Sequence, residues 1–466
     1  MFIQQLYTNC LSEAAYYIED NGEAAIIDPI RDTQVYVDLA KERKSTIKYI
    51  FETHFHADFV SGHLDLAKKT SATIVFGPYT ETQYKTLIAT DKQEFMIGRL
   101  KLVVLHTPGH TIESTCYLLH DETGVPHCIF TGDTLFVGDV GRPDLSSGDM
   151  SSEELAAMLY HSLQTKIKPL ADNIIVYPAH GPGSSCGKNI GPNASSTIGE
   201  EKRSNYALTA PDKPSFIKAV TEGLAAAPAY FKVNARINKE GYAPLNDIIE
   251  KGLRPVPVEQ LIKWKNEEKD MLVVDTRHAD IFSEGFIPDS IFIGLEGRFA
   301  EWAGSLLPFD TEILLVTEPG KEEESLVRLT RVGFDKNIGY LEGGFESWKK
   351  AGGAIDMIIS VDPDELAMDI PFDEHLQVID VRRATEFEEG HVKDAIHFPL
   401  DSMKDPMSMA MLNEHDNLYV HCGGGYRSII AASLMKRQGF HNLRNVSGGW
   451  KKIQELEFFA AQNTDQ

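Results

Sequence analysis

The sequence predicts an α/β protein in which a large N-terminal domain precedes two smaller, related α/β domains with mainly parallel sheets. Its 466 residues exceed what one hydrophobic core normally supports and suggest about three domains. Residues 272–293 resemble residues 378–399, and a Gly-Gly-aromatic segment follows each stretch at about the same distance. We therefore predict domains at residues 1–250, 251–356 and 357–466.

The composition is acidic, with 69 acidic against 45 basic residues and a formal charge of −24. Such a surface repels nucleic acids and anionic membranes, so we expect a soluble protein that acts on small molecules. The first ten residues, MFIQQLYTNC, lack the basic region and apolar stretch of a signal peptide, which favours a cytoplasmic location. The five cysteines are odd in number and widely spaced, so we expect thiols rather than disulfides.

In the N-terminal domain, four apolar runs typical of buried strands each end in a polar cluster. The clusters are Thr53–Asp58 after IKYIF, His106–His110 after LVVL, Thr131–Asp133 after CIF and Pro178–His180 after IIVY. One histidine at a strand end is more often structural than a metal ligand. Four such clusters in one domain favour a metal site, because strand ends on one sheet edge bring their side chains together.

The stretch THFHADFVSGH (53–63), followed by TPGH, TGD and PAH, resembles the metallo-β-lactamase superfamily, whose signature is HxHxDH with further His, Asp and His ligands. The resemblance covers about residues 1–250. It implies an αβ/βα sandwich with a metal site between the upper edges of two sheets. Phe59 replaces the last histidine of the signature, and a phenyl ring cannot bind a metal, so we expect one metal ion rather than two.

Within this superfamily, the resemblance to the persulfide dioxygenases implies one Fe(II) per chain. Carried over motif by motif, its ligands are His56, His110 and Asp133. Two imidazoles and one carboxylate suit Fe(II) and O₂, whereas zinc favours a closed structural site or a hydrolytic water. The segment GDVGRPDL (138–145) also resembles a loop of these dioxygenases, and we expect its Arg142 to hold an outer ligand in place.

Four other residues of this domain are expected beside the metal or the substrate: His54, Asp58, His180 and Cys186. For His180, a purely structural role is an equal alternative. Cys186 belongs to the Gly- and Ser-rich segment 180–192, which is typical of a surface loop. It could face the pocket mouth and exchange with a persulfide, or be a loop cysteine without a role.

The duplicated half of the chain resembles rhodanese domains, which are sulfurtransferases that carry sulfur as a cysteine persulfide. LYVHCGGGYRS (418–428) places Cys422 after an apolar strand and Arg427 before a helical segment. A loop of this length can direct several backbone N–H groups at one centre and, with Arg427, stabilise negative charge on sulfur. The resemblance implies that Cys422 is the nucleophile and that Arg427 assists it. The other residues of the persulfide cradle are Gly423, Gly424, Gly425 and Tyr426.

The middle domain departs from this pattern. Its equivalent loop, LLVTEPGKEEES (314–325), has Thr317 or Glu318 where the cysteine is expected. This loop cannot carry a persulfide, and its acidic residues would repel anionic sulfur species. We interpret the middle domain as an inactive copy with a structural or docking role.

Together the resemblances imply a persulfide dioxygenase fused to a rhodanese pair in sulfide detoxification. It would oxidise a low-molecular-weight persulfide with O₂ to sulfite plus thiol, and sulfur transfer to sulfite would give thiosulfate. There are two alternatives. One is a thioester hydrolase of the glyoxalase II type, and the other is a non-enzymatic persulfide carrier or sensor. The sequence leaves open which thiol carries the persulfide (glutathione, coenzyme A, bacillithiol or sulfide itself) and whether the protein is a homo-oligomer. No nucleic acid or membrane partner is expected.

Overall fold

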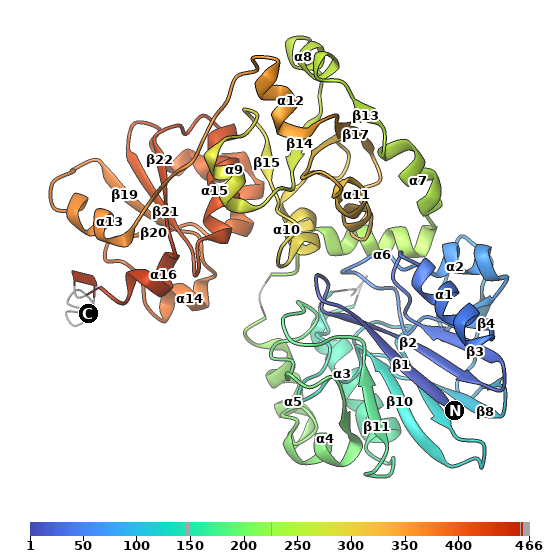
Figure 1. Ribbon diagram of the computed structural model, residues 1–466. Coiled ribbons are helices and arrows are strands. Elements are labelled where there is room, and N and C mark those ends of the chain that lie inside the picture. Colours follow the sequence, from blue (N-terminus) through green and yellow to red (C-terminus); the bar gives the residue numbers. More distant parts are fainter. Residues whose placement is uncertain (146–149, 225, 457, 460–466) are drawn as a thin grey trace. The chain divides into compact units, whose positions relative to one another are not determined.

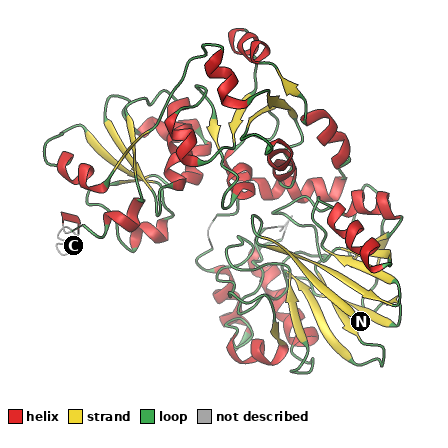
Figure 2. Ribbon diagram, viewed as in Figure 1, coloured by secondary structure: helices red, strands yellow, loops and turns green. Residues whose placement is uncertain are grey.

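The computed structural model describes residues 1–145, 150–224, 226–456 and 458–459 (Figure 1; Figure 2). The chain falls into two compact units: residues 1–247 with 329–333, and residues 248–328 with the residues after 333. The first unit corresponds to the predicted N-terminal domain, and the second contains both predicted small domains. Within the described residues, no helix has the length and apolarity needed to cross a membrane.

Two six-stranded sheets form the first unit. In spatial order, the first sheet consists of β1 (Phe2–Thr8), β2 (Glu13–Asp20), β3 (Glu23–Ile27), β4 (Thr46–Phe51), β5 (Thr73–Phe76) and β6 (Leu87–Ile88). The second consists of β12 (Ser196–Thr197), β11 (Ile175–Pro178), β10 (Pro126–Gly132), β9 (Thr115–His120), β8 (Leu100–His106) and β7 (Glu94–Ile97). The helices are α1 (Gln34–Arg43), α2 (His63–Thr70), α3 (Ser152–Ser162), the π-helix η1 (Leu163–Ile167), α4 (Ile198–Ser204), α5 (Lys213–Thr221), α6 (Tyr230–Glu240) and α7 (Leu245–Gly252), which ends in the second unit.

The main core of the first unit lies between the facing sides of its two sheets. Tyr16 and Phe51 of the first sheet belong to the same buried cluster as Leu102 and Phe130 of the second. Because alternate side chains of a strand point to opposite faces, β8 and β10 also supply a second cluster, which packs against α3, α4 and α5. On the opposite side of the sandwich, helices α1 and α2 contact β4 of the first sheet. This confirms the predicted αβ/βα sandwich.

The ends of the two sheets meet beside the predicted site. Gly132, at the end of β10, has φ +51°, and a Cβ atom there would lie 2.6 Å from the side chain of Thr53, which follows β4. Only glycine allows this close approach at a positive φ. The glycine of the TGD segment therefore brings Asp133 next to the histidines that follow β4.

The second unit contains two five-stranded sheets in which every strand pair is parallel. The middle sheet has the order β13 (Pro255–Val256), β17 (Asn337–Leu341), β16 (Ile313–Val316), β14 (Leu272–Asp275) and β15 (Ile291–Phe292). The C-terminal sheet has the order β18 (Ile359–Val361), β22 (Leu443–Val446), β21 (Asn417–His421), β19 (Leu376–Asp380) and β20 (Ile396–His397). The repeated strand order confirms two small, related α/β folds.

Helices of similar placement accompany each of these sheets. The middle sheet has α8 (Val258–Asn266), α9 (Ala279–Glu284), α10 (Phe299–Leu306), α11 (Glu322–Thr330) and α12 (Gly344–Lys350). The C-terminal sheet has α13 (Pro363–Asp369), α14 (Ala384–Glu388), the 3₁₀ helices η2 (Leu400–Lys404) and η3 (Pro406–Met411), α15 (Tyr426–Arg437) and α16 (Gly449–Ile453). The predicted boundaries at 250 and 356 stay predictions, although the division at 247/248 is close to the first.

Candidate metal centre and sulfur-transfer site

Three buried side chains converge at the meeting sheet edges: His54 after β4, His110 after β8 and Asp133 after β10. One potential ligand atom from each lies within 4.8 Å of the others. The Nε2 atom of His110 is 3.4 Å and that of His54 is 3.8 Å from Oδ2 of Asp133. The structure therefore brings two imidazoles and one carboxylate together.

The structure places His54 in this group in place of the expected His56. The Nε2 atom of His56 lies 3.1 Å from Oδ1 of Asp28 and 3.4 Å from Oε2 of Glu52. Asp28 and Glu52 follow β3 and β4, and HxH spacing alone cannot show which histidine they engage. We therefore replace His56 by His54 in the proposed ligand set.

Protonation of the two histidines supports this replacement. Burial, together with the neighbouring imidazoles, lowers the pKa of His54 well below its ordinary value, so this ring keeps a free lone pair at neutral pH. Burial also opposes protonation of His56, but Asp28 and Glu52 outweigh it and raise its pKa well above the ordinary value. A protonated imidazole between two carboxylates is a poor metal ligand.

The residues present fit a metal ion. Both carboxylate oxygens of Asp133 are buried and have no N–H or O–H partner among the described residues. An ionised carboxylate without a partner is costly in a protein interior, and a bound cation removes this cost. Two neutral imidazoles and a carboxylate are the donor set that suits Fe(II) with open positions.

A second cluster lies beside the first and contains His56, Asp58 and His180. The Nε2 atom of His180 lies 3.5 Å from both Oδ2 of Asp58 and Oδ1 of Asp133. The ring of Phe59 is fully buried, with its centroid 4.3 Å from that of His56. Because Phe59 offers no lone pair, this cluster lacks the ligand that a histidine would supply.

Arg142 orients His110 through its backbone rather than its side chain. The Nδ1 atom of His110 donates to the carbonyl oxygen of Arg142 at 2.8 Å, so its Nε2 faces Asp133. The Arg142 guanidinium makes two 2.7 Å hydrogen bonds to Asp144. A Cβ atom at Gly141 would lie 2.0 Å from the carbonyl oxygen of Asp133, so the turn requires glycine here. The loop thus fixes the orientation of the His110 ring.

Cys186 lies inside this region rather than at a mouth. It is 1% exposed and forms a close group with Asp133 and His180. Burial and the carboxylates of Asp58 and Asp133 raise its pKa well above the ordinary value, so it is a thiol at neutral pH. A buried neutral thiol is a weak nucleophile, which makes exchange with a persulfide less favourable.

The sequence prediction missed a group of buried acidic side chains next to His56 and His63. Asp28, Glu52 and His56 form a further close group, and His63 Nδ1 lies 3.2 Å from Oε1 of Glu52. Glu13 is fully buried, and burial raises its pKa well above the ordinary value. Asp28 and Glu52 directly follow apolar strands, so the signal that identified the histidines also marked them. Glu13 carried no such signal.

The second candidate site lies in the C-terminal α/β fold, where Cys422 follows β21. Its Sγ atom accepts a hydrogen bond from the Gly425 N–H at 3.1 Å and contacts Ser428 Oγ at 3.6 Å. Gly425 has φ +100°, a conformation that glycine adopts without strain. The expected cradle is thus represented by one direct amide contact and by Ser428, which the sequence prediction missed.

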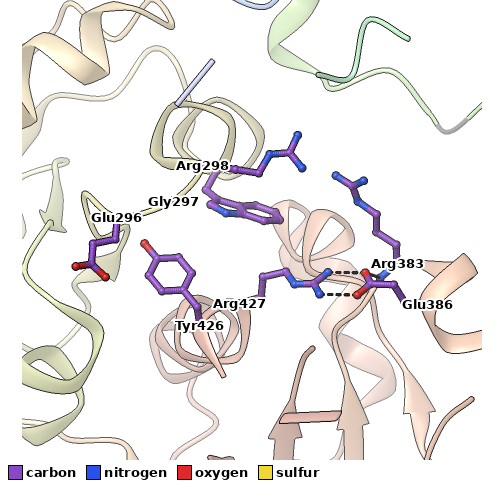
Figure 3. Close-up of a pocket in the computed structure, with 8 residues that line it drawn as sticks. Glu296, Gly297, Arg298, Arg383, Glu386, Tyr426 and Arg427 are labelled. Carbon is purple, nitrogen blue, oxygen red and sulfur yellow. Dashed lines mark hydrogen bonds and ion pairs between the residues drawn. The ribbon is translucent and has the colours of Figure 1, made fainter. Parts of the chain in front are cut away.

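Arg427 lies between this thiol and an acidic partner. Its Nη1 and Nη2 atoms donate to the two carboxylate oxygens of Glu386, each at 2.6 Å (Figure 3). The bonds to Glu386 and the nearby Cys422 sulfur raise the pKa of Arg427. Arg427 therefore stays charged beside the sulfur but is held by Glu386, a residue that sequence reasoning missed.

A pocket of about 550 Å³ opens beside Arg427 (Figure 3). It is lined by Glu296, Gly297, Arg298, Trp302, Arg383, Glu386, Tyr426 and Arg427. The first four residues come from the middle α/β fold and the last four from the C-terminal one. The equivalent middle loop has buried Thr317 after β16, Pro319 without an N–H, and Glu322 at the place of Arg427. That this copy is inactive stays a prediction.

Comparison with known proteins agrees with the N-terminal fold and with the two small folds. The metallo-beta-lactamase superfamily model matches residues 8–180, and the rhodanese-like domain model matches residues 257–351 and 362–456. The mitochondrial persulfide dioxygenase of Bos taurus is 32% identical over 192 residues, which are 41% of this chain and 68% of that protein. The chain belongs to the metallo-β-lactamase superfamily and carries two rhodanese-like domains after its N-terminal fold.

Two further relatives extend this comparison. A crystal structure of a metallo-beta-lactamase from Staphylococcus aureus is 35% identical, has a TM-score of 0.65, and covers 73% of this chain and 99% of that one. A probable hydroxyacylglutathione hydrolase of Schizosaccharomyces pombe is 32% identical over 165 residues, 35% of this chain. The chain spans only 60% of that hydrolase. Relatives of two chemistries thus share the N-terminal fold.

Proposed function

We propose that the protein is a persulfide dioxygenase whose C-terminal rhodanese domain transfers sulfur. One Fe(II) per chain would be held by His54, His110 and Asp133. The observation that carries this proposal is the convergence of two imidazoles and one unpartnered carboxylate, next to a second cluster that Phe59 deprives of a ligand. A bound Fe(II) would supply the redox chemistry with O₂.

The oxidation would convert one persulfide, one O₂ and one water into one thiol, sulfite and two protons. His110 is oriented for this task by the Arg142 carbonyl, and the buried walls of the site limit the access of other water. The buried carboxyl of Asp58, whose pKa is raised by burial, lies beside the site and could hold a proton.

The second reaction would take place at Cys422. The thiolate attacks the terminal sulfur of another persulfide, the S–S bond of that donor breaks, and the thiol leaves with the proton. Sulfite then attacks the outer sulfur of the Cys422 persulfide, which releases thiosulfate and restores the thiolate. Gly425 N–H and Ser428 Oγ face the sulfur that carries the charge in both steps. A cytoplasmic location and a role in sulfide detoxification complete the proposal.

A hydrolase of thioesters remains the second candidate. The hydroxyacylglutathione hydrolase relative supports it, and His56, Asp58 and His180 retain three ligand-type side chains of a second metal site. Against it stand Phe59 and the carboxylates that engage His56. A non-enzymatic persulfide carrier would require only Cys422 and would leave the buried His54, His110 and Asp133 group without a role.

Metal analysis and an oxygen electrode separate these candidates. The proposal expects about one iron per chain and O₂ uptake with persulfides of glutathione, coenzyme A, bacillithiol or sulfide, with sulfite or thiosulfate as product. Two tightly held zinc ions together with thioester hydrolysis would establish the hydrolase instead. Iron-loaded protein that consumes no O₂ with any of these persulfides would favour the carrier.

A further inference from the structure

The middle domain supplies four of the eight residues that line the pocket beside Arg427. Arg298 and Trp302 lie at the start and within the first turn of α10, and both line the pocket. The volume of about 550 Å³ is in the range that binds small organic ligands, and it is larger than sulfite or sulfide needs. The pocket therefore has room for an organic group attached to the reacting sulfur.

The charges of the pocket favour an anionic ligand at one end. Glu301, in the first turn of α10, forms an ion pair with Arg298. It also pairs with Arg383 of the C-terminal fold, whose Nη2 atom lies 3.4 Å from Oε1 of Glu301. Two guanidinium groups thus share one carboxylate, although the whole chain carries a charge of −24. The remaining lining arginine, Arg427, forms an ion pair with Glu386 and is therefore less available to a ligand. In Figure 3 the Arg298 and Arg383 side chains extend into the same part of the pocket, while Glu296 lies on the other side.

The middle domain is also attached directly to the Cys422 loop. The hydroxyl of Tyr426 donates to the carbonyl oxygen of Gly294 at 2.8 Å, and its ring contacts that of Phe292. A Cβ atom at Gly294 would lie 2.9 Å from the Tyr426 hydroxyl, so this approach depends on glycine. The wall that carries Arg298 and Trp302 is therefore fixed relative to the loop that carries the sulfur.

We propose that this pocket binds the organic part of an anionic low-molecular-weight persulfide, and that the middle domain thereby selects the sulfur donor. This inference rests on the proposed sulfur transfer at Cys422. A carboxylate or phosphate of the donor binds between Arg298 and Arg383, since arginine pairs well with both groups. Its carbon chain packs on the Trp302 indole. The terminal sulfur then reaches Cys422 past Arg427, and the donor leaves as a thiol after its S–S bond breaks.

The test measures how fast Cys422 of the full-length protein gains one sulfur, followed by mass spectrometry in single turnover. Two donors of similar size and opposite charge are compared, the persulfides of 3-mercaptopropionate and of cysteamine. We expect the unmodified protein to prefer the anionic donor. Arg298→Met should slow loading from this donor about tenfold, as expected for one lost charge-assisted hydrogen bond, and should abolish the preference. Trp302→Ala should slow loading from both donors, and Trp302→Phe should restore most of the rate.

Arg254→Met serves as the matched control, because Arg254 is exposed on the middle domain and does not line the pocket. Thermal unfolding of each variant shows whether its fold is kept. Equal loading from both donors by the unmodified protein, or loading by folded Arg298→Met at the unmodified rate, would overturn the inference while leaving sulfur transfer intact. Absence of any loading of Cys422 would instead overturn the proposed function. Glutathione persulfide and coenzyme A persulfide as further donors distinguish a carboxylate from a phosphate as the recognised group.

Discussion

At the scale of single residues, neighbouring charges decide which histidine can bind a metal. His54 and His56 are two positions apart, yet burial keeps the first neutral while Asp28 and Glu52 favour protonation of the second. The surroundings of two cysteines also differ, since Cys186 lies near the carboxylates of Asp58 and Asp133, whereas Cys422 Sγ contacts the Gly425 amide and the Ser428 hydroxyl. The contacts that distinguish the two histidines thus come from Asp28 and Glu52, outside the HxH motif, whereas the contacts of Cys422 lie within residues 422–428.

His54→Ala should therefore remove the iron, because it deletes one of three proposed ligands. We expect bound iron to fall at least about tenfold and O₂ uptake to fall with it. Elemental analysis of the purified variant measures the loss. His120→Ala is the control, since His120 lies at the end of β9 and its ring donates to the carbonyl oxygen of Gly124, away from the proposed ligands. Iron retained at the unmodified level in His54→Ala would contradict the ligand set. In the opposite direction, Phe59→His should allow a second metal ion to bind.

The pair of Glu386 and Arg427 should make the stability of the C-terminal domain depend on pH. Its hydrogen bonds with Arg427 hold the pKa of Glu386 below the ordinary value. The stabilisation is therefore present above about pH 4.5, where an unfolded glutamate is ionised, and is lost as the pH falls through the lower pKa of the folded state. Since Glu386 is partly exposed, the effect should be at most about 1 kcal/mol.

Glu386→Gln tests this dependence. The free energy of unfolding should be lower in the variant at pH 7, and the difference from the unmodified protein should shrink as the pH falls below about 4.5. Chemical unfolding followed at several pH values measures this difference. A difference that grows on acidification would show that Glu386 is not ionised in the folded protein.

At the scale of secondary-structure elements, the two small domains have kept the same framework. Arg277 and Asp275 make the same contacts as Arg382 and Asp380, with 2.6 Å between the closest atoms of each pair. Each arginine also donates to a backbone carbonyl eight residues further on. The loop after the fourth strand of each copy in chain order differs, with Thr317 after β16 and Cys422 after β21, although the surrounding framework is the same.

Thr317→Cys should accordingly fail to create a second sulfur-transfer site. Pro319 provides no N–H, and Glu322 puts an acidic side chain where Arg427 lies in the C-terminal copy. The experiment places Thr317→Cys in a chain that already carries Cys422→Ser. Sulfur transfer from thiosulfate should stay at the level of Cys422→Ser alone. A clear gain would show that the loop backbone alone suffices to activate a cysteine.

The sequence predicted the strands well because their apolar runs and the polar clusters after them were both present. IKYIF and LVVL became β4 and β8, and both predicted small folds are present. The choice between His54 and His56, and the role of Glu386, could not be predicted, because each depends on side chains distant along the chain. Glu386 lies 41 positions before Arg427, and Trp302 lies in the middle domain rather than in the C-terminal one.

At the scale of the whole molecule, one chain carries both a candidate oxidation site and a candidate sulfur-transfer site, each within its own compact unit. Sulfite, the proposed product of the first, is an acceptor for the sulfur held by the second. This pairing predicts thiosulfate as the end product, because sulfite would meet a persulfide of Cys422 rather than accumulate.

Cys422→Ser should leave O₂ uptake largely unchanged and shift the product from thiosulfate to sulfite. The reason is that the proposed iron ligands lie in the other unit of the chain. Product analysis beside an oxygen electrode measures both quantities in the same sample. Thiosulfate formed at the unmodified rate, after correction for the spontaneous reaction of sulfite with persulfide, would show that the two reactions are not coupled through Cys422.

The contact between the two small folds also protects a sheet edge. β15 is the last strand of the middle sheet, and the N–H of Phe292 within it donates to Ser433 Oγ of α15 at 3.1 Å. An uncovered apolar edge strand can pair with the strand of another molecule and start aggregation. A chain shortened to end before residue 357 would expose this edge and is expected to self-associate. The C-terminal copy thus covers an edge of the middle sheet that would otherwise be open to pairing with another molecule.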